Sequence, residues 1–134
     1  MKTLLLSSLL IFALIACKTK KGTAQLDKLE NSSWEVVLLN SEIPDSKQTI
    51  TIIDNSLKGK AACNGFGGKI NLTDKNLISI SDIVSTKMAC PNLSEENTLF
   101  QNLRNSTNFK RVKEELSFYN SDNKLLVKLK KIEL

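Results

Sequence analysis

The residues that could support catalysis are few. The chain has 134 residues, with three cysteines (Cys17, Cys63 and Cys90) and no histidine. Without histidine, the Ser-His-Asp and Cys-His arrangements of nucleophilic catalysis cannot form, and no imidazole can ligate a metal. Cys63 and Cys90 also lack the CxxC spacing of a zinc site or a redox motif. We therefore expect no catalytic residue, no metal site, no cofactor and no enzyme activity.

The glycine-rich stretch CNGFGGKI (residues 63–70) could in principle hold a phosphate. However, Gly68-Lys69 is followed by Ile70 rather than Ser or Thr, and the last glycine of a dinucleotide fingerprint is missing. We expect a tight turn instead, in which glycine adopts a positive φ and Asn64 bonds its own backbone. The following acidic side chains are expected to be solvated rather than paired for catalysis: Glu95, Glu96, Glu114 and Glu115.

The N-terminus resembles an export signal. Lys2 precedes an apolar stretch, residues 4–16, that is shorter than the roughly 20 residues of a membrane span. This pattern is typical of a secretory signal peptide. The sequence LIAC (residues 14–17) resembles a bacterial lipobox, which implies cleavage before Cys17 and acylation of that residue. We expect residues 1–16 to be the signal peptide and residues 17–31 the lipidated cysteine with a flexible linker. The alternatives are an uncleaved anchor and a soluble secreted protein.

Cys63 and Cys90 are left in a domain that the signal sends out of the reducing cytoplasm. Two cysteines in an oxidising compartment more often form a disulfide than remain free. We expect a Cys63–Cys90 bond that ties the glycine-rich turn to the segment before Pro91. The alternative is a pair of buried thiols that act as small hydrophobic residues. Met88 is expected to point into the core beside the sulfurs.

Composition and charge favour one small domain over residues 32–134. About a hundred residues of ordinary apolar content suffice for one core but not for two. The formal net charge of +5 is only mildly basic, and there is no basic patch interleaved with aromatic residues. We expect no nucleic-acid partner, a membrane contact through Cys17, and a monomer.

The periodicity of apolar residues predicts a mostly antiparallel β domain with one helix. A helix is expected over residues 94–105, with Ser94 as its cap and Leu99, Phe100 and Leu103 on its buried face. Pro91 should end the segment before it. Strand patterns occupy residues 34–40, 48–53, 68–72, 76–80, 82–90, 108–113, 115–120 and 125–134.

Two stretches together resemble the META domain family, which includes heat-shock lipoproteins of the HslJ type. The resemblance covers about residues 32–131. The first stretch is Gly59-x-x-x-Cys63-Asn64-x-Phe66-x-Gly68, and the second is Ser85-Thr86-Lys87-Met88-Ala89-Cys90, followed by Glu96, Phe100 and Leu103. The resemblance implies a β-rich α+β domain that forms a cracked barrel, association with envelope stress and drug tolerance, and no established catalytic residues.

Two classes of function follow from these observations. The first is a non-catalytic envelope lipoprotein that docks an unknown protein partner, on the periplasmic face of the outer membrane. The second is a carrier that holds a lipid or small apolar ligand inside the cracked barrel. The first is favoured, because the apolar residues that would line a carrier are also those that an ordinary core requires. A third possibility, inhibition of cell-wall hydrolases, would need a protruding acidic or polar loop, for which the sequence offers no strong candidate.

Overall fold

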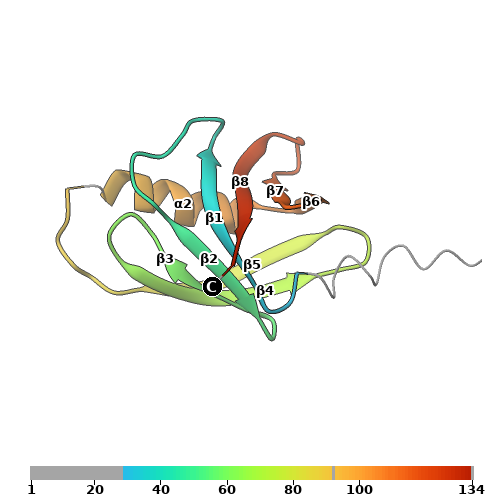
Figure 1. The fold of residues 1–134 in the computed structure, drawn as a ribbon, viewed down its shortest axis with the longest axis horizontal. Coiled ribbons are helices and arrows are strands. Elements are labelled where there is room, and N and C mark those ends of the chain that lie inside the picture. Colours follow the sequence, from blue (N-terminus) through green and yellow to red (C-terminus); the bar gives the residue numbers. More distant parts are fainter. Residues whose placement is uncertain (1–28, 92, 134) are drawn as a thin grey trace, which may run out of the picture.

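The computed structural model describes residues 29–91 and 93–133. The sheet order is β5-β4-β3-β2-β1-β8-β7-β6, and every pair of neighbouring strands is antiparallel. The elements, in chain order, are β1 (Ser32–Leu39), β2 (Thr49–Ile53), β3 (Ser56–Lys60), β4 (Gly65–Leu72), β5 (Ile78–Ser85), α2 (Leu93–Asn105), β6 (Asn108–Val112), β7 (Glu115–Tyr119) and β8 (Leu125–Ile132) (Figure 1).

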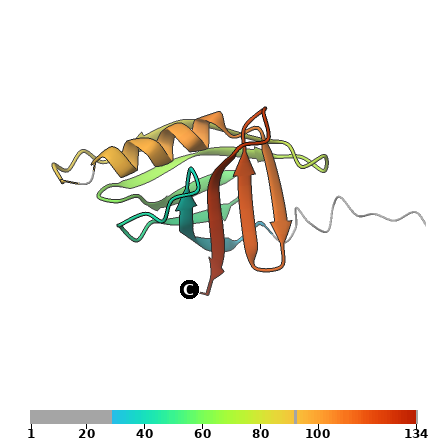
Figure 2. The same ribbon diagram turned by 90° about the horizontal axis from the view of Figure 1, so that it is seen from above.

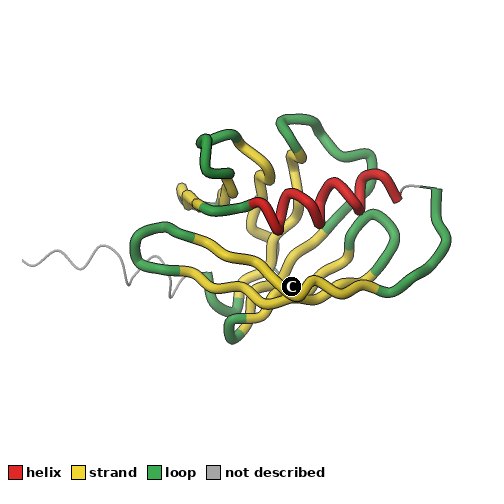
Figure 3. The backbone as a smooth tube through the Cα atoms, turned by 180° about the vertical axis from the view of Figure 1, so that it is seen from behind, coloured by secondary structure: helices red, strands yellow, loops and turns green. Residues whose placement is uncertain are grey.

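The sheet curls into a half-barrel whose two edge strands meet at one end. The Ile78 N–H donates to the Thr107 carbonyl (3.0 Å), and the Phe109 N–H donates to the Asn76 carbonyl (2.9 Å). These bonds bring the start of β5 beside the start of β6, while the sheet order gives the rest of the two strands no pairing with each other. The predicted β-rich α+β fold with a cracked barrel and one helix is therefore confirmed over the described residues (Figure 3).

Alternating side chains fill the concave side of the sheet. Trp34 of β1 and Phe118 of β7 are almost fully buried there, and Arg111 places its guanidinium 5.5 Å from the centre of the Trp34 ring. Helix α2 packs against β5, β8 and β1 on the side toward which the sheet curls (Figure 2). The helix buries Leu99, Phe100 and Leu103, the predicted face. The core is thus made by the sheet and the helix together.

The helix begins slightly earlier than predicted. It starts at Leu93, so Ser94 lies inside its first turn and is not the cap that the sequence predicted. The other end agrees with the prediction, because the last helical residue is Asn105. Pro91 stands just before the helix, outside β5, which ends at Ser85.

The glycine-rich stretch is mainly strand rather than turn, contrary to the expectation. The irregular residues are 61–64, β4 begins at Gly65, and no described glycine has a positive φ. Gly59 is instead needed because β2 passes close to it: a Cβ at this position would lie 2.0 Å from the Thr49 carbonyl oxygen. A Cβ on Gly68 would lie 3.0 Å from the Ser81 carbonyl oxygen. These two glycines allow close packing between strands.

The strand β3 was not predicted, although its hairpin with β2 has an ordinary cause. Asp54 and Asn55 connect the two strands with φ values of 48° and 59°. Aspartate and asparagine tolerate this left-handed conformation, and two such residues in succession suit the twist of a hairpin. The pairing of Ile53 with Ser56 closes the loop.

Packing extends to the first described residue. Leu29 is fully buried within the core, and the Glu30 carboxylate accepts the Asp54 N–H (2.9 Å). The packed domain therefore includes residues that precede the expected start at residue 32. The predicted signal peptide, Cys17 and residues 17–28 of the predicted linker lie outside the described residues. Within residues 29–91 and 93–133, none of the helices has the length and hydropathy needed to cross a bilayer.

Candidate functional site

Two carboxylates in the first turn of α2 each hold a separate loop. Glu95 and Glu96 are adjacent in sequence, so their side chains leave the helix about 100° apart. Acidic residues are favourable in this turn because the helix dipole places positive potential there. Here, the carboxylates also accept hydrogen bonds from backbone groups of distant segments. The first turn of α2 therefore connects the helix to distant segments of the chain. We call Glu95, Glu96 and the groups that they bind the junction.

Glu96 is buried, contrary to the expectation that it is solvated. Only 4% of its surface is exposed. Its Oε2 accepts the N–H groups of Cys63 (3.4 Å) and Asn64 (2.8 Å), and its Oε1 accepts the Asn64 side-chain amide (2.8 Å). These three donors replace the water that a buried carboxylate loses. By contrast, Glu114 and Glu115 are exposed, as expected.

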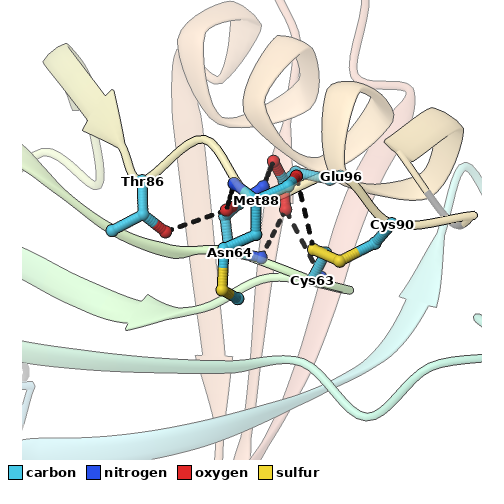
Figure 4. The surroundings of a disulfide bond; sticks show 6 residues. All are labelled: Cys63, Asn64, Thr86, Met88, Cys90 and Glu96. Carbon is cyan, nitrogen blue, oxygen red and sulfur yellow. Dashed lines mark hydrogen bonds between the residues drawn. A yellow bond between two sulfur atoms is a disulfide. The ribbon is translucent and has the colours of Figure 1, made fainter.

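Asn64 extends the network to the segment that follows β5. Its Oδ1 accepts the Thr86 hydroxyl (2.8 Å) and the Met88 N–H (2.7 Å), while its Nδ2 donates to Glu96 (Figure 4). The expectation that Asn64 bonds its own backbone is therefore wrong. With 2% of its surface exposed, this one amide joins three segments of the chain.

Cys63 and Cys90 lie at disulfide distance beside this network. Their Cα atoms are 6.1 Å apart, within the range of about 4.4–6.8 Å that a disulfide spans, and the structure joins their sulfur atoms. Cys63 is buried and Cys90 is partly exposed. The bond would fasten the end of the 86–91 segment to the same turn that Glu96 holds (Figure 4).

Met88 points away from the core, so that prediction is wrong. Its side chain is 56% exposed, and Ala89 is also exposed. The Met88 N–H donates to the buried Asn64 Oδ1, so the backbone of Met88, and not its side chain, faces the network. Only the backbone of Met88 takes part in the network.

The two stretches of the sequence motif meet at this junction. Phe66 packs edge-to-face on Phe100, with ring centroids 5.1 Å apart, and Gly59 leaves room for the Phe66 ring. Ser85 pairs with Phe66 across β4 and β5 but is exposed. The sequence reasoning missed the role of Glu96. A signal existed, because residues 96, 99, 100 and 103 share one helical face.

Glu95 holds the loop between β1 and β2, which was also not predicted. Its carboxylate accepts the N–H groups of Asp45 (2.6 Å) and Ser46 (3.2 Å) and the amide of Gln48 (3.4 Å). Gln48 is fully buried, and its Oε1 has no hydrogen-bond partner within the described residues. The loop is therefore fixed to the helix at several points, and its tip carries Ile43.

Open hollows flank this loop on two sides. One, of about 220 Å³, lies between the loop and the start of α2, and a second, of about 350 Å³, lies between the loop and β1. Ile43 and Pro44 line both. A third hollow, of about 320 Å³, lies over β4 and β5 and includes Lys69. Asp82 pairs with Lys69 (2.8 Å) and raises its pKa.

The contacts of the site hold distant backbone segments together. Among residues 29–91 and 93–133, no three His, Cys, Asp or Glu side chains are grouped as a metal would require. The side chains at the junction are occupied with one another, through the amide, carboxylate and sulfur contacts already described.

Two solved structures share the fold. The first is the NMR structure of a protein from Burkholderia xenovorans, with a TM-score of 0.65 and 18% identity over 83% of this chain and 88% of that one. The second, also an NMR structure, has a TM-score of 0.63 and 17% identity over 78% of this chain and 92% of that one. A search of curated proteins gives no match.

The family comparison covers the whole described region. The sequence profile of the META domain matches residues 27–133, a range that includes both motif stretches and Leu29. This family is not known for catalysis. Given this match over residues 27–133, the chain belongs to the META domain family.

Proposed function

We propose that the chain is a non-catalytic lipoprotein of the cell envelope whose META domain docks a protein partner. In this proposal, acylated Cys17 holds the domain on the periplasmic face of the outer membrane. The role is accessory and is connected with envelope stress or drug tolerance. The lipobox-like LIAC sequence supports the anchor. The disulfide distance between Cys63 and Cys90 suits an oxidising compartment.

The filled interior of the half-barrel is the observation that supports docking over carriage. Trp34, Leu116, Phe118 and Leu129 are all at most 1% exposed, and α2 packs against β5, β8 and β1. A carrier must offer its ligand an apolar space, and here the chain's own side chains occupy it. The hollows flanking the β1–β2 loop are open and lined in part by charged groups. The outer surface is therefore the part available to a partner.

A deletion strain, complemented with either the wild type or Cys17→Ser, tests the proposal. We expect the deletion to increase sensitivity to drugs that act on the envelope and only the lipidated form to restore tolerance. Equal rescue by the Ser variant would contradict the need for an anchor. Unchanged sensitivity in the deletion strain would contradict the accessory role.

Native mass spectrometry of full-length protein extracted in detergent separates docking from carriage. We expect the mass of the acylated chain alone. A second lipid molecule bound in a stoichiometric amount, without a covalent bond, would favour the carrier and refute docking as the main role.

A further inference from the structure

We propose that the β1–β2 loop, residues 40–48, is the docking element, and that it binds a protein with a basic surface around an apolar pocket. This inference rests on the proposed docking function and names its site. Ile43 at the tip is 81% exposed, more than any other large apolar side chain among the described residues. Single exposed apolar residues are ordinary on protein surfaces, so the argument depends on how this one is presented.

The loop is held in place before any partner arrives. Leu39 and Glu42 exchange backbone hydrogen bonds (2.8 and 2.9 Å), and the Asn40 N–H donates to the Leu126 carbonyl (2.9 Å). On the other side of the tip, the Glu95 carboxylate accepts two backbone N–H groups. Ile43 is followed by Pro44, which fixes its own φ. A preorganised loop loses little conformational entropy on binding, which is the property expected of a docking element.

The shape of the surface allows Ile43 to act as an anchor. The hollows of about 220 and 350 Å³ lie on its two sides, so a partner that encloses Ile43 can also fill them. Two largely buried apolar residues also line the hollows, Leu39 the first and Val36 the second. Anchors of this kind, surrounded by a rim that excludes water, contribute most of the binding energy at protein interfaces.

The charge around the loop defines the partner. Glu42 and Asp45 are exposed beside Ile43, and Glu95 lines the hollow next to the helix. The cation of the loop, Lys47, pairs with Glu35 (3.4 Å). This surface is therefore acidic, on a chain whose formal net charge is +5. A complementary partner presents Lys and Arg around its pocket.

Photocrosslinking in intact cells tests the site. A photoreactive amino acid replaces Ile43 in the full-length chain, and the control replaces Val112, a 51% exposed residue at the end of β6. We expect one discrete adduct from position 43, with a protein of basic surface, and none from position 112. The purified partner should then bind full-length protein in detergent about 10- to 100-fold more weakly when Ile43→Asp is introduced. Glu42→Lys should weaken binding and reduce its dependence on salt.

Each other outcome decides against the inference in a different way. An adduct from position 112 but not from 43 overturns the loop as the site and leaves docking in place. An adduct with the mass of two copies of this chain, or with an acidic protein, overturns the stated partner. No adduct from either position overturns the loop. If the deletion strain also shows unchanged drug sensitivity, the accessory role in drug tolerance fails as well.

Discussion

Replacing the buried carboxylate of Glu96 with an amide should weaken the junction in a way that simple repacking cannot relieve. Gln in place of Glu keeps the side-chain shape but changes one acceptor oxygen into an NH₂ donor. If the remaining oxygen faces the two backbone N–H groups, the new NH₂ faces the Asn64 amide nitrogen. Asn64 cannot turn its amide to compensate, because its Oδ1 already accepts from Thr86 and Met88. At least one buried donor is therefore left unpaired.

The size of the effect follows from these bonds. Hydrogen bonds to a charged group contribute about 1.5–3 kcal/mol each, and an unsatisfied buried donor costs about 1–3 kcal/mol. Glu96→Gln loses one such bond, orphans one donor and weakens the bonds that remain. The substitution also removes the cost of desolvating a buried charge, and this gain partly offsets the lost hydrogen-bond energy. We expect a decrease of about 2–4 kcal/mol in the free energy of unfolding, a large share of the ~5–15 kcal/mol of a small domain.

Urea unfolding of the full-length, oxidised protein measures the effect. The chain has one tryptophan, Trp34, which is fully buried and reports unfolding by its fluorescence. We expect the urea midpoint of Glu96→Gln to fall by about 1–2 M. The matched control is Glu133→Gln on an exposed carboxylate after β8, which should change the free energy of unfolding by less than about 0.5 kcal/mol. A Glu96→Gln variant as stable as this control would refute the reasoning.

Three further predictions concern the disulfide, the glycines and the anchor. Cys63→Ser and Cys90→Ser should each cost about 3–4 kcal/mol for a separation of 27 residues, and the double variant about the same, by urea unfolding. Alkylation of both thiols in unreduced wild-type protein would contradict the bond. Gly59→Ala should cost at least about 3 kcal/mol, because its Cβ would lie 2.0 Å from a β2 carbonyl oxygen. Gly67→Ala, with its nearest contact at 3.6 Å, should be neutral or slightly stabilising, and equal losses would disprove the steric argument. Cys17→Ser should release a folded domain or leave an unprocessed precursor on cell fractionation, and a cleaved variant that stays on the membrane would exclude lipid anchoring.

The regular elements were predictable where the apolar pattern is strong. Residues 49–52 of β2 alternate Thr with Ile, and the helix carries Leu99, Phe100 and Leu103 at helical spacing. The strand β3 was missed because SLKGK contains a single buried apolar residue, Leu57, and gives no alternation to read. Propensity alone favours a turn at this glycine, whereas pairing with β2 and β4 decides the outcome.

The site was less predictable because its hydrogen bonds join distant segments. The side chain of Asn64 suits a local turn, and its choice of Glu96, Thr86 and the Met88 backbone depends on how the segments meet. The position of the Met88 side chain was also unpredictable. Its hydrophobicity favours burial, but its backbone is bound to Asn64 and the side chain is exposed. The charge of Glu96 also led to a wrong prediction, namely that its side chain is solvated. A carboxylate is usually solvated, unless packing brings several N–H donors to it.

The position of β8 between β1 and β7 has a consequence for biosynthesis. Residues 33–39 of β1 pair with residues 127–132, so the middle of the sheet closes only when residues 127–132 are available. A nascent chain that lacks these residues exposes one edge of β1 and leaves the β6–β7 hairpin without its neighbour. Contacts so distant in sequence also slow folding. Truncation before residue 125 should therefore remove the strand that joins β1 to β7 and leave a fragment with unpaired strand edges, which favour aggregation.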